Sequence, residues 1–133
     1  KANNQQYITP VRLQAYERMI LFLERISVYN LIPRVNQSGY SAFQLQKAMI
    51  QAIRDEYDHN LSQQLYISSE AWDHIRRARE ESIRMINMAV SKLDSNASGS
   101  ELAASLFDLY EKTTGSFIQS ALDTLKKEIA QFY

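Results

Sequence analysis

The sequence predicts an all-α fold: a single-domain helical bundle of about five helical segments, four of them main helices, mostly antiparallel. Glycine and proline are scarce, with three and two copies in 133 residues, so few sites exist for the tight hairpins of a sandwich or barrel. Apolar residues recur at steps of three and four, which is the spacing of one helical face. Capping signals precede several of these stretches.

The bundle is organised around the segment Ser69–Leu93, which follows the start signal Ser68 and contains neither glycine nor proline. At about 1.5 Å per residue it would be roughly 37 Å long, so it needs partners along its whole length. Its apolar and small residues share one face: Ala71, Ile75, Ala78, Ser82, Met85, Ala89 and Leu93.

The other predicted helical segments are Pro10–Ser27, Ala42–Asp58, Glu101–Lys112 and Phe117–Phe132. Thr9 can act as N-cap for the first of them, with proline at the first helical position. Three pairs have the spacing of a capping box: Ser41 with Gln44, Ser98 with Glu101, and Ser116 with Gln119. Each of these capping signals comes directly before a stretch of apolar residues at helical spacing, so the capping signals and the apolar spacing predict the same helices.

The remaining stretches are predicted as connections within one domain of residues 1–133. Residues 1–8 form a polar lead-in. Val28–Tyr40 is the longest predicted connection. No helix is predicted in it, because Pro33 disfavours helical geometry at Ile32. Leu61–Ile67 is a short helical turn rather than a strand, because its two leucines are four residues apart.

The first helix carries the predicted interaction surface. Met19–Leu23 is apolar on all sides, so this helix should be covered on more than one side. We expect Met19, Leu21 and Phe22 to form a contact with another chain, with Phe22 on the least covered flank. The predicted core is Leu13, Tyr16, Ile20, Leu23, Met49, Ile53, Trp72, Ile75, Ile86, Leu106, Leu122, Leu125 and Ile129.

The charge pattern argues against nucleic acid as a partner. Fifteen basic residues balance fifteen acidic ones, so the chain has no general attraction for phosphate. Of the four arginines between positions 76 and 84, two follow an acidic residue by four positions, in the pairs Asp73–Arg77 and Glu80–Arg84, as on a solvated, ion-paired helix surface. The balance is uneven along the chain, with a net charge of +5 over residues 1–54 and −5 over residues 55–133.

The candidate chemistry is limited to one possible metal site. Glu56 and His59 have the Glu-x-x-His spacing that di-iron bundles use twice, and here it occurs once. Glu70 and His74 could complete a mononuclear site if the two helix ends meet. The alternative is a His59 that interacts with the helix dipole and a His74 that faces solvent, and we favour it. We therefore expect no metal, no other cofactor and no catalytic residues; the chain has no cysteine and no glycine-rich phosphate loop.

Three stretches carry a resemblance to a known group of proteins: Ile8–Ser27, His59–Trp72 and Ser91–Leu102. They resemble an uncharacterised family of small helical proteins from Bacteroidetes-type bacteria. The resemblance implies a transmembrane helix and a short charged spacer upstream of Lys1, and it implies no activity. The missing initiating Met agrees with an upstream anchor, and the basic residues nearest the span predict an inner-membrane protein with this domain in the cytoplasm.

We therefore predict a non-enzymatic protein-interaction or scaffolding domain, which binds a protein partner or self-associates. The alternative is a metal-binding bundle protein or enzyme that uses Glu56 and His59.

Overall fold

The computed structural model describes residues 7–113 and 116–132. Its elements are α1 (Pro10–Ile26), α2 (Val28–Val35), α3 (Ala42–His59), the 3₁₀ helix η2 (Leu61–Tyr66), α4 (Ser69–Ser91), α5 (Gly99–Thr113) and α6 (Ser116–Ala130). The predicted all-α class is confirmed, since these residues form no strand beyond an isolated bridge between Ser41 and Ser98. They form seven helical elements rather than about five, because α2 and η2 are helices in their own right.

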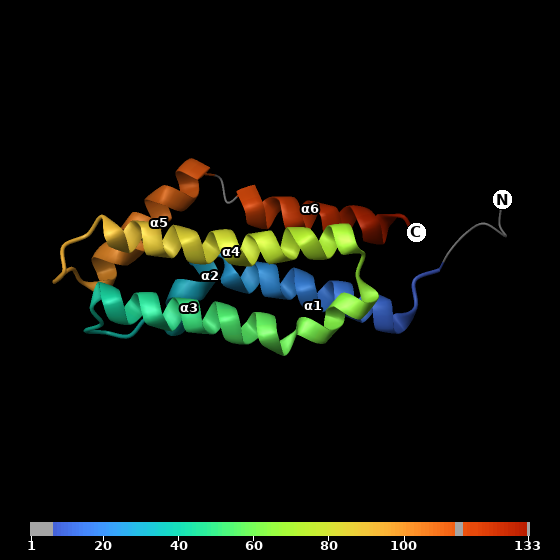
Figure 1. Ribbon diagram of the computed structural model, residues 1–133, viewed down its shortest axis with the longest axis horizontal. Helices are drawn as coiled ribbons and strands as arrows, with labels where there is room; N and C mark the ends of the chain where they lie inside the picture. The colour runs from blue at the N-terminus through green and yellow to red at the C-terminus, as the bar shows by residue number, and fades with distance from the viewer. Residues whose placement is uncertain (1–6, 114–115, 133) are drawn as a thin grey trace.

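Helix α4 is the central element of the bundle. It contacts α1, α3, α5 and α6. Figure 1 shows α1, α3, α4 and α6 lying lengthwise, with α5 inclined at one end. The predicted inward face is confirmed: five of its residues on α4 are buried and Met85 is half-buried. Leu93, which lies just beyond the C-terminus of α4, is half-buried as well.

The predicted core is largely confirmed. Nine of its thirteen residues are buried, among them Tyr16, Ile75 and Leu125. The four others are half-buried at the margins of the helix faces: Leu13, Ile20, Trp72 and Ile129. The helical spacing of the apolar residues therefore identified the inward faces, and it was less accurate at their edges.

The capping predictions are confirmed where the structure describes both partners. The Thr9 hydroxyl accepts a hydrogen bond from the Arg12 amide at 3.2 Å. Ser41 and Gln44 exchange the two bonds of a capping box, and Ser98 and Glu101 do the same ahead of α5. The box predicted for Ser116 depends on a side chain outside the described residues.

The segment predicted as the longest connection contains a helix. Proline at position 33 removes a backbone donor and crowds the preceding turn, which is why no helix was expected. Tertiary contacts outweigh that cost, because Val28, Leu31 and Ile32 of α2 are buried, and each such burial is worth about 1.5–3 kcal/mol. Ser27 departs from helical geometry, with φ −58° and ψ 139°, and so separates α1 from α2.

A polar network inside the bundle joins three helices. The Tyr16 hydroxyl of α1 donates to the Glu128 carboxylate of α6 at 2.7 Å. The Ser68 hydroxyl donates to the other carboxylate oxygen at 2.6 Å and accepts from the Ala71 amide. Glu128 therefore lies beside the N-terminus of α4, where the helix dipole favours a negative charge.

Candidate functional site

A surface groove between α1 and α3 contains most of the residues singled out in the sequence. It has a volume of about 470 Å³. Its walls combine leucine and phenylalanine side chains with charged groups of both signs, and the lining residues are Arg18, Leu21, Phe22, Arg25, Asp55, Glu56, His59 and Asn60. We refer to it as the α1–α3 groove.

Of the three residues predicted to form an interaction surface, only Leu21 is on the surface. Its exposed fraction is 58%. The prediction is wrong for Met19 and Phe22, whose exposed fractions are 0% and 1%. The reason is that α1 packs against α2, α3, α4, α6 and η2, so little more than the side bearing Leu21 is left uncovered.

Phe22 instead forms the floor of the groove and is held by other aromatic rings. Its ring lies 6.0 Å from that of Tyr57 on α3, and Tyr57 lies 5.7 Å from Trp72 on α4. The guanidinium group of Arg79 stacks over the Tyr57 ring at 4.7 Å. Such aromatic pairs add about 0.5–1.5 kcal/mol beyond area burial, so the floor is a rigid part of the core.

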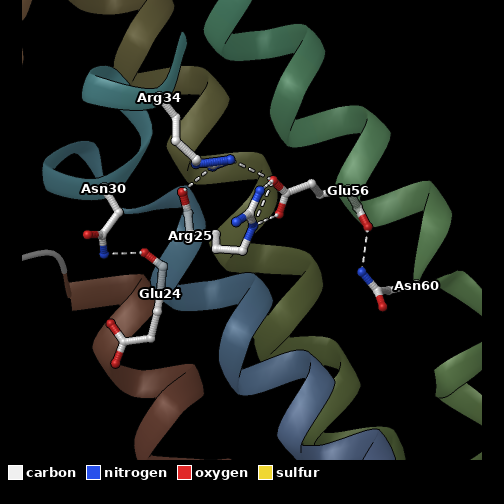
Figure 2. A network of polar contacts seen from close by, with 6 residues as sticks. All are labelled: Glu24, Arg25, Asn30, Arg34, Glu56 and Asn60. Atoms are coloured by element: carbon white, nitrogen blue, oxygen red, sulfur yellow. Dashed lines mark hydrogen bonds and ion pairs between the residues drawn. The ribbon is translucent and has the colours of Figure 1, made fainter.

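An ion cluster forms one end of the groove, and it is drawn in Figure 2. Both oxygens of the Glu56 carboxylate accept from Arg25, at 2.9–3.1 Å, and one of them also accepts from Arg34 at 3.0 Å. These bonds to Glu56 raise the pKa of Arg25. The cluster joins α1, α2 and α3, since each helix contributes one member.

The same cluster completes the C-terminus of α1. Because α1 stops at Ile26, its last carbonyl groups have no partner within the helix. Asn30 donates to the carbonyl of Glu24 at 2.8 Å, and Arg34 donates to the carbonyl of Arg25 at 2.9 Å. Arg34 therefore both caps α1 and neutralises Glu56.

The other end of the groove is closed by a weaker contact. Arg18 donates to the side-chain oxygen of Asn60 at 3.1 Å, and the Asn60 amide group donates to the carbonyl of Glu56 at 2.8 Å. Asp55, on the rim, accepts from Gln51 at 2.7 Å. Among the described residues, neither Arg18 nor Asp55 has an ion-pair partner.

The four candidate metal ligands do not come together in one site. Glu56 and His59 both line the groove, but Glu70 and His74 lie on α4 and do not. Within the described parts of the chain, no group of three or more such side chains could hold a metal ion. The Glu56 carboxylate is bound by two guanidinium groups instead, whose positive charges take the place that a cation would need.

The apolar surface continues from the groove onto η2. His59 lines the groove and also a shallow hollow beside it that contains Leu61 and Leu65. Leu65 is the more exposed of these leucines, at 78%. The sequence predicted a helical turn here but gave no sign that both leucines would lie on the surface.

A second, smaller cavity of about 170 Å³ lies between α4, α5 and α6. It is mainly apolar, with walls that include Met85, Met88, Leu109, Phe117 and Ile118. It contains none of the candidate metal ligands or interaction residues predicted from the sequence, and the salt bridge between Glu81 and Arg84 is the charged feature of its lining.

The basic residues of α1, which predicted the side of the membrane, are bound within the domain. Arg12 donates to the carbonyl of Tyr66 at 3.2 Å and lies over the ring of Phe132. Arg18 and Arg25 make the groove contacts described above, and Lys1 lies outside the described residues. In the part of the chain that is described, no helix has the length and apolar character needed to cross a bilayer.

The model of a protein family of unknown function (DUF7935) matches residues 1–132. Because this match covers nearly the whole chain, the protein belongs to that family. No curated protein matches the chain, and no solved structure matches it either. The resemblance to an uncharacterised family is thus confirmed.

Proposed function

We propose that this protein is a non-enzymatic interaction domain that binds a protein partner in the α1–α3 groove and on the neighbouring leucines of η2. The observation that carries the proposal is the position of Leu21. It is a large apolar side chain, 58% exposed, in a groove whose rim carries charges of both signs. An apolar centre with a polar rim is the usual composition of a protein-binding surface.

The energetics of the groove favour binding. Burying one leucine side chain is worth about 1.5–3 kcal/mol, and Leu21, Leu61 and Leu65 could all be covered by one partner. The floor is already ordered by the contacts of Phe22 with Tyr57. A partner therefore loses less free energy to side-chain ordering than it would on a mobile surface.

The acidic groups of the groove are arranged for structure rather than for chemistry. Glu56 accepts from both Arg25 and Arg34, and Asp55 accepts from Gln51. A general base needs a carboxylate oxygen that is free to reach the proton it removes, and both oxygens of Glu56 already accept hydrogen bonds from guanidinium groups. This favours the binding role over the metal-dependent alternative.

Site-specific cross-linking tests the proposed surface. A photoreactive amino acid placed at Leu21 in the full-length protein, in the cells that naturally make it, should give a discrete protein adduct. The matched control is position 43, because Phe43 is exposed to a similar degree, 61%, and does not line the groove. Equal adducts from both positions, or none from position 21, would contradict the proposal.

We also propose that the full-length protein is tethered to the inner membrane with this domain in the cytoplasm. The support is the family resemblance and the net charge of +5 over residues 1–54. Basic residues act on topology while the chain inserts, before the fold exists, so their later contacts within α1 do not conflict with this role. Fractionation of the full-length protein, together with an alkaline phosphatase fusion after Tyr133, tests it: the proposal expects membrane association and an inactive fusion.

A further inference from the structure

We propose that the cavity between α4, α5 and α6 binds a small neutral molecule, with an apolar body the size of one benzene ring and a single hydrogen-bonding group. The inference goes beyond the proposed interaction function, since the cavity shares no lining residue with the α1–α3 groove. It depends on the volume of the cavity, on a buried serine hydroxyl that has no partner, and on the pairing of the charges at the opening.

The cavity lies where α5 diverges from the rest of the bundle. Figure 1 shows α5 inclined to α4, whereas α6 runs alongside α4. The side chains that face this divergence leave a space of about 170 Å³, with Met85 and Met88 on the α4 side and Leu109 and Ile118 opposite them. An apolar cavity of about 150 Å³ is large enough to bind benzene. This cavity therefore has room for one ring-sized molecule.

Ser82 supplies a hydrogen-bonding group inside this apolar space. Its exposed fraction is 6%, and it lines the cavity. Within the described parts of the chain, its hydroxyl has no hydrogen-bond partner, whereas Ser91 of the same helix donates to the carbonyl of Met88 at 2.7 Å. A buried hydroxyl without a partner destabilises a fold, so a ligand that bonds to Ser82 removes this cost. Because a hydroxyl both donates and accepts, the ligand group can be a donor or an acceptor.

The charged groups that line the cavity lie at its opening and are already paired. Glu81 and Arg84 form a salt bridge at 3.1 Å, and the Arg84 side chain is 69% exposed. Each therefore neutralises the other. A carboxylate or an ammonium group that entered the cavity would lose its hydration without gaining an unpaired opposite charge. This favours a neutral ligand.

The walls are suited to an aromatic ring. Met85 and Met88 are flexible thioethers, which adapt to irregular shapes and make favourable contacts with rings. Tyr110 and Phe117 add aromatic surface. The Tyr110 ring is held by an edge contact with Tyr29, at 5.2 Å between centroids. Phenol, which combines one ring with one hydroxyl, is therefore the simplest probe of the site.

NMR of the whole chain with ¹³C-labelled methionine methyl groups tests the site, because the chain has four methionines. Met85 and Met88 line the cavity, whereas Met19 and Met49 are completely buried elsewhere and serve as internal controls. Phenol should shift the signals of Met85 and Met88 to saturation, with a dissociation constant of about 1 mM or below, and leave the other two unchanged. No saturable shift, or equal shifts of all four signals, would overturn the proposal.

Ser82→Ala tests the role of the hydroxyl. The variant should bind phenol about three- to tenfold more weakly than the wild type, because one hydrogen bond is lost, and it should bind toluene, which has no hydroxyl, equally well. It should fold with a Tm no lower than that of the wild type, since the hydroxyl has no partner in the free chain. The matched control is Ser105→Ala, which changes a half-buried serine of α5 outside the cavity and should alter neither affinity. Unchanged phenol binding in Ser82→Ala, or an equal loss for phenol and toluene, would overturn the assignment of Ser82.

Benzoate tests the preference for a neutral ligand. It carries a carboxylate on the same ring, so it should bind at least about tenfold more weakly than phenol. Benzoate that binds as tightly as phenol would refute a neutral site. The result is independent of the α1–α3 groove: phenol binding without a specific cross-link at Leu21 would leave this inference standing and remove the interaction function, and the reverse result would do the opposite.

Discussion

Tyr16→Phe should destabilise the bundle measurably although it changes one atom. The side chain is fully buried, and its hydroxyl donates to the Glu128 carboxylate at 2.7 Å. Hydrogen bonds to charged groups contribute about 1.5–3 kcal/mol. Glu128 is half-buried and keeps its bond from Ser68, so water can replace part of the loss. We therefore expect a decrease of about 1.5–2 kcal/mol in the free energy of unfolding, or about 5–7 °C in Tm for a chain of this length.

The assay is urea unfolding followed by circular dichroism, with a double-mutant cycle. Glu128→Gln removes the charge, and if the two groups interact, Tyr16→Phe should cost less in that background than in the wild type. A change below about 0.5 kcal/mol for Tyr16→Phe would refute the reasoning, because it would fall within the range of ordinary surface substitutions.

The hydrogen bond between Tyr16 and Glu128 also predicts how the stability of the fold changes in alkaline solution. Burial, followed by the hydrogen bond to Glu128, raises the pKa of Tyr16 above its ordinary value. In the unfolded chain this phenol loses its proton near pH 10, while in the folded chain it still holds it. Its contribution to stability is therefore present below about pH 10 and is lost as the pH rises from there through the folded pKa. The alkaline loss should be smaller in Tyr16→Phe than in the wild type.

Three further predictions concern the core, the groove and the surface of α4. Leu125→Ala should cost about 2–5 kcal/mol, because the residue is completely buried, and calorimetry should show it as a lower Tm. Glu56→Gln should cost about 0.5–1 kcal/mol, because the ion pairs of Glu56 with Arg25 and Arg34 are partly exposed to solvent, and it should speed limited proteolysis within α2. The hydrogen bond from Arg76 lowers the pKa of Asp73, so that pair stabilises the fold above about pH 4 and its contribution is lost as the pH falls through the folded pKa. Asp73→Asn should therefore reduce the loss of Tm in acid.

The features that the sequence predicted well depend on local physics. Helix faces follow from a spacing of three or four residues, and caps such as Ser41 with Gln44 follow from contacts three residues apart. These rules need no knowledge of the tertiary structure. They identified the all-α class, the central position of α4 and most of the core.

The features that were missed depend on contacts between distant residues. Met19–Leu23 is apolar on every side, so periodicity could not show which residue would be left outside, and Phe22 was placed on the surface although it is buried. Likewise Arg25 and Glu56 are 31 residues apart, and nothing in their spacing indicates an ion pair. The Glu-x-x-His spacing of Glu56 and His59 also gave no sign that two guanidinium groups would bind the Glu56 carboxylate.

The shape of the groove depends most on the segment that the sequence predicted as a loop. Because Ser27 interrupts the helix, the carbonyl groups of Glu24 and Arg25 are released, and Asn30 and Arg34 of α2 bind them. Arg34 then also binds the carboxylate on α3 that forms one end of the groove. The interruption at Ser27 therefore does more than connect α1 and α2, because it places Arg34 where it can bind Glu56 as the second guanidinium group beside Arg25. This cluster holds α1 and α3 at a separation that leaves Leu21 exposed above the buried Phe22. The proposed binding surface needs both an exposed leucine and an ordered floor, because a mobile groove would lose part of the binding free energy to side-chain ordering.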